Sequence, residues 1–331
     1  MTKSIFISTF PFADADKTPL NLLRDNDIQY HINPLSRKLN ELELASLSNN
    51  FDILIAGTEL ISTKVLRPDS KLKFISRVGI GLDGVNLPLA RKLGIPVSYT
   101  PDAPAPAVAE LTIGLMLSML RKIHTANSTM HNSQWIRYFG KRIGDISIGI
   151  IGFGRIGSRV LDLLLPFSPK SIKIFDADKS KLMSIPEKHR ARSLDELLVN
   201  SDLISIHIPL TAQNRGLLNA NNLSSMKKGS YLVNTARGGI VSEPDLAELL
   251  KSGHLSGAAI DVFEEEPYSG LLNTLDNCLL TSHMGSMSLD CRSQMEIEAT
   301  EEAIRFAQGK NLINPVPDSE YLSQEMELRN D

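Results

Sequence analysis

One glycine-rich segment constrains the fold of this chain more than any other feature. Gly152-Phe153-Gly154-Arg155-Ile156-Gly157 follows an apolar run, Ile148 to Ile151, and opens a segment with helical periodicity. An acid, Asp176, ends the next apolar run 22 residues beyond Gly154 (176 − 154). A strand, a G-x-G-x-x-G turn, a helix and an acid at this spacing are typical of a βαβ unit that binds a dinucleotide. A glycine turn of purely structural use is the alternative, and the combination of features disfavours it.

Each part of this motif has a physical role in binding a dinucleotide. The glycines permit a tight turn and let the backbone approach a pyrophosphate, whose charge lies at the positive end of the following helix. Asp176 would accept hydrogen bonds from the adenosine ribose. The next residue is Ala177 rather than a basic residue, so a 2′-phosphate would meet the carboxylate without a compensating cation. The motif therefore predicts NAD rather than NADP.

Apolar runs bounded by turn residues alternate with helical segments along the chain, which is typical of α/β folds with parallel sheets. The runs fall into two sets, and each set predicts an open, doubly wound sheet. The strands are expected within residues 4–8, 51–57, 71–79 and 94–100, and then within 146–157, 171–178, 202–210, 229–238, 256–263 and 278–285. Helical segments at 108–123 and 286–310 are expected to carry the chain between the sets, and the polar tail beyond Pro317 to be loosely held.

Composition excludes several classes of protein. The chain has 331 residues, with 35 Lys plus Arg against 38 Asp plus Glu, so it has no basic excess that would make nucleic acid the default partner. The most apolar stretch, Leu111 to Leu120, is too short to span a membrane. Cys278 and Cys291 lack metal-ligand or disulfide-framework spacing, so no metal is expected and a reducing cytoplasm is the simplest compartment.

Three polar residues fall at or just beyond the ends of predicted strands in the second set: Arg237, Glu266 and His283. This edge of a doubly wound sheet is where ligands bind. Their chemistry suits hydride transfer to a 2-keto acid, because His can donate a proton to the carbonyl oxygen, a carboxylate favours imidazolium, and Arg grips the substrate carboxylate. A structural histidine and surface charges are the alternatives for each residue alone. Within Glu264-Glu265-Glu266, spacing does not choose the member.

At this point the sequence resembles a known family, the D-isomer-specific 2-hydroxyacid dehydrogenases. The motifs that carry the resemblance, in order, are VGIGLDGVN (78–86), GFGRIG (152–157), HIPLT (207–211), NTARGG (234–239), DVFEEEP (261–267) and TSHMGS (281–286). The resemblance implies a flavodoxin-like substrate-binding domain made from both chain ends, 1–100 and 286–331, around a Rossmann NAD-binding domain at 101–285. It also implies that Arg237 binds substrate, that Glu266 pairs with the catalytic histidine, and that His283 is the acid/base.

The same resemblance assigns the groups around the ligands. The loop Val78-Gly79-Ile80 would supply backbone amides to the substrate carboxylate. Asp261 would hold the carboxamide side of the nicotinamide. The full set implied around NAD is Gly152, Gly154, Arg155, Ile156, Gly157, Asp176, His207, Pro209, Thr235, Ala236, Asp261, His283 and Gly285.

The substrate is predicted less sharply than the reaction. Arg77 directly precedes the carboxylate loop, an arrangement similar to that of 3-phosphoglycerate dehydrogenases of serine biosynthesis, in which the matching arginine faces the substrate phosphate. Because few residues follow Pro317, a short form without a regulatory domain is expected. The favoured substrate is therefore 3-phosphoglycerate, with glyoxylate, hydroxypyruvate or another 2-keto acid as the alternative. For Arg77 itself, a salt bridge is the alternative to a contact with substrate.

Two further expectations concern partners. A protein of another class, an NAD-sensing binding protein like the C-terminal-binding-protein corepressors, would keep the same motifs. The resemblance also implies a homodimer formed through the region from Pro101 to Gly144. Trp135 and Tyr138 would be buried at that contact, with ordinary core packing as the alternative.

Overall fold

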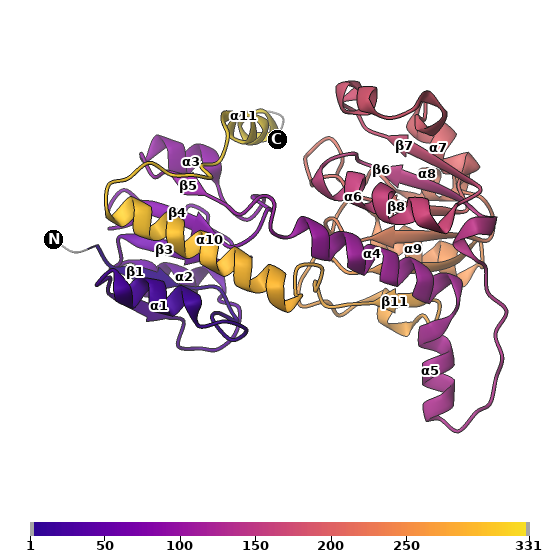
Figure 1. The fold of residues 1–331 in the computed structure, drawn as a ribbon, viewed down its shortest axis with the longest axis horizontal. Helices are drawn as coiled ribbons and strands as arrows, with labels where there is room; N and C mark the ends of the chain where they lie inside the picture. The colour runs from indigo at the N-terminus through magenta and orange to yellow at the C-terminus, as the bar shows by residue number, and fades with distance from the viewer. Residues whose placement is uncertain (1–2, 329–331) are drawn as a thin grey trace. The chain divides into compact units, whose positions relative to one another are not determined.

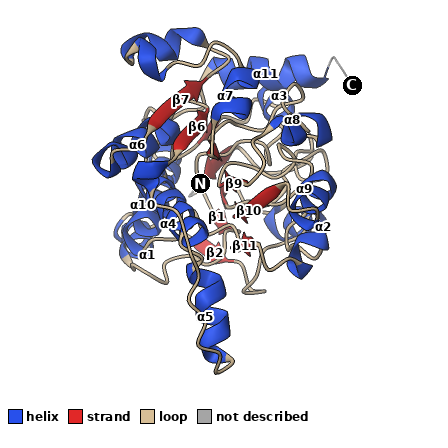
Figure 2. Cartoon of the chain, turned by 90° about the vertical axis from the view of Figure 1, so that its right-hand side faces the viewer, coloured by secondary structure: helices blue, strands red, loops and turns tan. Residues whose placement is uncertain are grey.

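The computed structural model describes residues 3–328, and the chain forms two compact units. Unit 1 is Met1–Pro104 with Met287–Asp331, and unit 2 is Ala105–Ser286. Each has its own parallel sheet flanked by helices, so the predicted α/β class with two doubly wound sheets is confirmed (Figures 1 and 2). The two ends of the predicted substrate domain, residues 1–2 and 329–331, lie outside the described residues.

The sheet of unit 1 has the order β2-β1-β3-β4-β5, with every pair parallel. Its direction of winding reverses between β1 and β3, which is the ligand-binding position in flavodoxin-like sheets. The strands are β1 (Ile5–Ile7), β2 (Tyr30–Ile32), β3 (Ile53–Ala56), β4 (Phe74–Arg77) and β5 (Val97–Ser98). The helices are α1 (Thr18–Asp25), α2 (Glu41–Ser48), α3 (Leu87–Lys92), α10 (Leu289–Ala307) and α11 (Asp318–Leu328).

The sheet of unit 2 has the order β11-β10-β9-β8-β6-β7 and is parallel throughout. The reversal lies between β6 and β8, so the ends of these two strands form the switch point. The strands are β6 (Ser147–Ile151), β7 (Ser171–Phe175), β8 (Leu203–Ile206), β9 (Ser230–Asn234), β10 (Leu255–Ile260) and β11 (Cys278–Leu280). The helices are α4 (Ala105–Leu120), α5 (Ile123–His131), α6 (Arg155–Leu164), α7 (Leu194–Asn200), α8 (Ala220–Ser225) and α9 (Glu243–Lys251).

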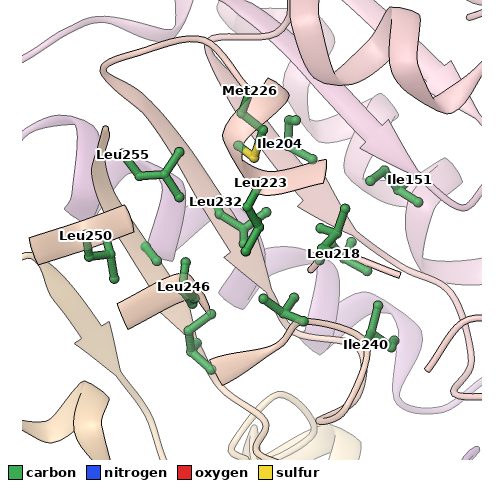
Figure 3. Packing of buried hydrophobic residues seen from close by; sticks show 14 of the residues in the cluster. Ile151, Ile204, Leu218, Leu223, Met226, Leu232, Ile240, Leu246, Leu250 and Leu255 are labelled. Carbon is green, nitrogen blue, oxygen red and sulfur yellow. The ribbon is translucent and has the colours of Figure 1, made fainter. Parts of the chain in front are cut away.

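The sheet of unit 2 is covered on both faces, as near-continuous apolar strands require. Figure 3 shows one layer, in which side chains of β8 and β9 meet Leu223 of α8 and Leu246 and Leu250 of α9. On the other face α4 and α6 pack together and α4 crosses β9 and β10. These two layers hold the carboxyl ends of the strands rigidly in place.

The structure differs from the sequence predictions at one strand and at two helices. The strand is β2 (Tyr30–Ile32), which lies at the edge of the sheet of unit 1 and was not predicted. The apolar segment 108–123 ends as a helix at Leu120, because Lys122 has a left-handed conformation (φ 53°) and starts α5 in a new direction. The prediction of a loosely held tail beyond Pro317 was wrong for its described part, residues 318–328. It forms α11, which buries Tyr321 in the core of unit 1 and joins α3 through Gln324, whose Oε1 accepts a hydrogen bond from Leu87 N.

Candidate active site

The glycine turn lies at the switch point of unit 2. Gly152 has a φ of 96°, and its N–H donates to the carbonyl of Phe175 over 2.7 Å. A Cβ on Gly157 would lie 2.1 Å from the carbonyl oxygen of Gly152, so only glycine lets α6 approach the turn this closely. In contrast, a Cβ on Gly154 would meet nothing within 4 Å, and Gly154 gives α6 no side-chain cap. The first turn of α6 therefore has no side-chain cap from Gly154 and borders open space, which fits a pyrophosphate.

Asp176 follows β7 and borders the same turn. Its Oδ2 accepts a hydrogen bond from Phe153 N (2.8 Å) and its Oδ1 from Asp178 N (2.9 Å), so the carboxylate is fixed beside the glycine loop. A pocket of about 260 Å³ adjoins it, lined by Phe175, Asp176, Lys179, Leu182, Arg190, Ala191 and Arg192. A wall of apolar and cationic side chains next to a fixed acid fits an adenosine. The prediction that no cation lies near Asp176 was wrong, because Lys181 Nζ is 3.5 Å from Oδ2.

The ends of β8 and β9 carry four more of the residues predicted around the cofactor, namely His207, Pro209, Thr235 and Ala236. His207 follows β8, with Nε2 2.7 Å from Ser205 Oγ and no hydrogen-bond partner for Nδ1 among the described residues. Burial lowers the pKa of His207 to about 3, so the ring is neutral at pH 7. Pro209 is exposed two residues on, while Thr235 and Ala236 follow β9, where Thr235 Oγ1 lies 2.8 Å from Thr112 Oγ1 of α4.

His283 and Glu266 form a direct pair. His283 Nδ1 lies 3.0 Å from Oε1 and 2.9 Å from Oε2 of Glu266, and the two side chains are 33% and 25% exposed. Glu266 Oε1 also accepts a hydrogen bond from Phe263 N (3.1 Å), which ties the acid to its own loop. Of the three consecutive acids, geometry therefore selects Glu266, since Glu264 and Glu265 are exposed and Glu264 faces Arg215. A carboxylate held on Nδ1 leaves Nε2 to exchange a proton with a substrate.

Arg237 follows β9, the strand next to the one that leads into Glu266. The two loops touch, because a Cβ on Gly238 would lie 1.9 Å from the carbonyl carbon of Phe263. Asn234 supports the turn by donating from Nδ2 to the carbonyl of Arg237 over 2.9 Å. The ends of β9, β10 and β11 thus carry Arg237, Glu266 and His283 on one edge of one sheet.

Asp261, at the end of β10, holds the loop that carries His283. Its Oδ1 accepts hydrogen bonds from Thr281 Oγ1 (2.6 Å) and Met284 N (2.9 Å), and its Oδ2 accepts one from Gly285 N (2.9 Å). His283 itself has a φ of 50° and donates its N–H to the carbonyl of Asp261. Asp261 is 1% exposed, and its hydrogen bonds show that it holds the loop that carries His283. Its contact with a nicotinamide carboxamide stays a prediction.

The predicted carboxylate loop lies in unit 1, after β4. Two of its three amides are already used, since Val78 N donates to Ala56 O (2.8 Å) and Gly79 N to Thr100 Oγ1 (2.8 Å). The amide of Ile80 has no acceptor among the described residues. Of the three amides predicted to bind the substrate carboxylate, this one therefore remains as a donor. Arg77 is 7% exposed and donates from Nη1 to the carbonyl of Val78.

Sequence reasoning missed two charged groups at these edges. Lys181 lies in a short 3-10 helix, Lys179–Ser184, and no sequence pattern predicts that this helix returns Lys181 to Asp176. Glu59 follows β3 by three residues and is 2% exposed. Its signal was available, because it is a polar residue just beyond a predicted strand, the same criterion that selected Arg237 and His283.

The described part of the chain was also searched for metal-binding clusters and for membrane-spanning helices. Within residues 3–328, no cluster of three His, Cys, Asp or Glu side chains is arranged to hold a metal ion. No helix in that range combines the length and the apolar character needed to cross a bilayer.

Comparisons with known proteins agree with this geometry. The sequence model for "D-isomer specific 2-hydroxyacid dehydrogenase, NAD binding domain" matches residues 113–285. The chain is 35% identical to a glyoxylate reductase of Thermofilum pendens, over 81% of each chain, and 34% identical to a hydroxypyruvate reductase of Thermotoga maritima, over 88% of this chain and 95% of that one. It is 31% identical to a D-3-phosphoglycerate dehydrogenase of Bacillus subtilis, over 81% of this chain and 52% of the relative. The crystal structure of the TT0316 protein from Thermus thermophilus superposes with a TM-score of 0.85 at 30% identity, covering 95% of this chain and all of that one.

Proposed function

Because this chain belongs to the D-isomer-specific 2-hydroxyacid dehydrogenases, which are NAD-dependent oxidoreductases, we propose that it interconverts small 2-keto acids and D-2-hydroxy acids that carry one negative charge. The observation that carries the proposed chemistry is the pairing of His283 with Glu266 on the sheet edge that also bears the glycine turn. Bound NADH supplies the hydride. The protein's own groups must then bind the acid, orient its carbonyl and move one proton.

The proposed roles follow from what each group can donate or accept. His283 Nε2 gives a proton to the carbonyl oxygen during reduction and takes it back during oxidation. Glu266 stabilises the imidazolium through Nδ1 and holds the ring in place. Arg237 pairs with the substrate carboxylate and draws electron density from the adjacent carbonyl, and the amide of Ile80 is the donor proposed from unit 1.

The roles proposed around NAD use the features at the switch point of unit 2. The amides at the start of α6, including those of Arg155 and Ile156, would bind the pyrophosphate, and Asp176 the adenosine ribose. His207, Pro209, Thr235, Ala236 and Gly285 would line the remainder of the cofactor. Neutral His207 adds no charge to that surface.

The preference for an unphosphorylated substrate rests on Arg77. Its guanidinium is buried and donates to the protein's own backbone, so it is less able to receive a phosphate dianion than an exposed arginine would be. The competing substrate is 3-phosphohydroxypyruvate of serine biosynthesis, favoured by the position of Arg77 before the loop and by the relative in Bacillus subtilis.

A substrate panel with NADH tests the proposal. Glyoxylate and hydroxypyruvate should be reduced with a kcat/KM at least about tenfold above that for 3-phosphohydroxypyruvate. The reverse order would refute the proposed substrate class, and NADH binding without turnover of any keto acid would favour the sensor alternative.

His283→Ala should lose at least about a hundredfold in turnover while the Kd for NADH stays within about twofold. Unchanged turnover would remove the acid/base role.

We also propose that the partner of this chain is a second copy of itself. The segment made of α5 and the following loop extends away from the sheet of unit 2 in both ribbon views (Figures 1 and 2). It exposes Met130, Trp135, Ile136 and Phe139, and at 78% exposure Trp135 is not packed in the core of its own chain. Contiguous exposed apolar side chains of this kind mark interaction surfaces. Light scattering should give a dimer mass, and Trp135→Ser with Phe139→Ser should give a monomer.

A reducing cytoplasm is the proposed compartment. Cys278 and Cys291 are both buried free thiols. Free cysteines are typical of proteins that work where glutathione and thioredoxin keep thiols reduced.

A further inference from the structure

Lys181 gives the acid proposed to bind the adenosine ribose a partner of opposite charge. Its Nζ lies 3.5 Å from Asp176 Oδ2, the oxygen that also accepts a hydrogen bond from Phe153 N. The side chain of Asp176 is 8% exposed and that of Lys181 is 48% exposed, so the acid is fixed while much of the lysine faces solvent. Each carboxylate oxygen has two lone pairs, so Asp176 can still accept a ribose hydroxyl beside these donors.

The pocket beside Asp176 is lined by more bases than acids. Of its seven lining residues, Lys179, Arg190 and Arg192 are basic and Asp176 is acidic. Arg190 donates from Nε and Nη2 to backbone carbonyls, which are neutral acceptors, so these bonds do not neutralise its charge. Arg192 pairs with Glu196 over 3.1 Å. The wall of the pocket therefore adds positive charge next to the fixed acid.

The segment between Asp176 and Lys181 carries no net charge of its own. It holds two acids, Asp176 and Asp178, and two lysines, Lys179 and Lys181, so its formal charge is zero. Asp178 is exposed, and hydrogen bonds from Ser180 Oγ (2.6 Å) and Ser180 N (3.0 Å) hold its pKa below the usual range. The arginines of the pocket wall come in addition to this neutral segment.

These charges bear on which adenosines this edge of the sheet can accept. NADP differs from NAD by a phosphate on the ribose 2′-oxygen, the group that an acid at the position of Asp176 binds. An unpartnered carboxylate would repel this phosphate, which carries about −1.5 to −2 charges at pH 7. Lys181 offsets the charge of the acid, and its exposed ammonium can turn to the phosphate. Ala177, which follows Asp176, is exposed and too small to block that approach.

We propose that unit 2 accepts NADP as well as NAD, and that Lys181 is the residue that makes the 2′-phosphate acceptable. The inference leaves NAD in place as a cofactor and adds its phosphorylated form. It deepens the proposed function and rests on it, since it takes Asp176 as the acid that faces the adenosine ribose.

The first test compares two nucleotides that differ only by this phosphate, so it needs no turnover. 2′,5′-ADP and 5′-AMP are titrated into the whole protein by calorimetry at low salt and about pH 7.5, where the phosphate is a dianion. The readout is the ratio of the Kd for 2′,5′-ADP to the Kd for 5′-AMP. In wild type this ratio should be at most about ten. A higher ratio would overturn the inference.

The second test compares Lys181→Met with a matched control, Lys170→Met. Lys170 is also an exposed lysine of unit 2, but it precedes β7, so it lies at the opposite edge of the sheet from Asp176, which follows β7. Lys181→Met should raise the ratio at least about tenfold, by an amount that shrinks at high salt, and Lys170→Met should change it by less than about twofold. Lys181→Arg keeps the charge and should keep the ratio within about threefold of wild type. An unchanged ratio in folded Lys181→Met would overturn the inference.

Turnover separates this inference from the proposed function. Wild type should reduce hydroxypyruvate with NADPH at a kcat/KM within about tenfold of that with NADH, and Lys181→Met should lose activity with NADPH far more than with NADH. A protein that binds the two nucleotides in the expected ratio but reduces no keto acid would refute the proposed function and leave this inference standing. The two failures are therefore distinguishable.

Discussion

Replacing Glu266 by Gln tests the central pair of the site with almost no change of shape. The amide oxygen can still accept a hydrogen bond from His283 Nδ1 and from Phe263 N, so only the negative charge is lost. A hydrogen bond to a charged group contributes about 1.5–3 kcal/mol, and the exposure of the two side chains, 33% and 25%, places this pair toward the lower end. Since each 1.36 kcal/mol is a factor of ten in rate, kcat should fall about 10- to 30-fold.

The assay is NADH-dependent reduction of hydroxypyruvate at pH 7, followed by loss of NADH absorbance. Glu265→Gln, an exposed acid one residue away, is the control and should change kcat by less than about twofold. The Kd for NADH should be equal in both variants, because neither residue is proposed to contact the cofactor. A folded Glu266→Gln protein with wild-type kcat would refute the assignment of the carboxylate to imidazolium stabilisation.

Three further outcomes follow from the described contacts. Burial lowers the pKa of His207 from 6.5 to about 3, so below pH 6.5 the unfolded chain binds a proton that the folded chain does not. Relative to His207→Gln, wild type should therefore lose up to about 1.4 kcal/mol of unfolding free energy for each pH unit below 6.5. The same pH dependence of the unfolding free energy in both proteins, measured by urea denaturation from pH 6.5 to 4.5, would contradict this. Asp261→Asn puts an NH₂ group against at least one of the donors Thr281, Met284 and Gly285, and should cost about 2–3 kcal/mol and lower kcat, with an unchanged melting temperature as the contrary result. Tyr321→Ala should cost about 3 kcal/mol in thermal unfolding because the ring is buried under Arg91, whereas a loosely held tail would give no change.

Much of the site could be predicted because strand ends in a parallel sheet share an edge. Alternating apolar runs and turn residues located the strands that lead to Arg237, Glu266 and His283, and the topology then brings those ends together. The glycine motif is equally local, since Gly152 and Gly157 are required by a turn and a helix that follow each other directly in the chain.

The errors concern partners supplied by distant or irregular segments. Ala177 alone suggested that no cation accompanies Asp176, but a short 3-10 helix returns Lys181 to it. The loop after β4 was expected to offer its backbone amides, yet Ala56 of β3 and Thr100, which follows β5, accept hydrogen bonds from two of them. The tail was judged by polarity, and one ring, Tyr321, packs it onto unit 1.

By itself the amino-acid sequence determined the α/β class, the nucleotide-binding turn and the identity of the acid/base candidates, because each depends on residues close together in the chain or on one rule of sheet topology. The tertiary structure decided which acid of Glu264-Glu265-Glu266 faces His283 and which amides of the loop after β4 are already bonded to Ala56 and Thr100. Hydrogen bonds and charge compensation act over a few ångströms, and residues 17 or more positions apart come within that range only when the chain has folded.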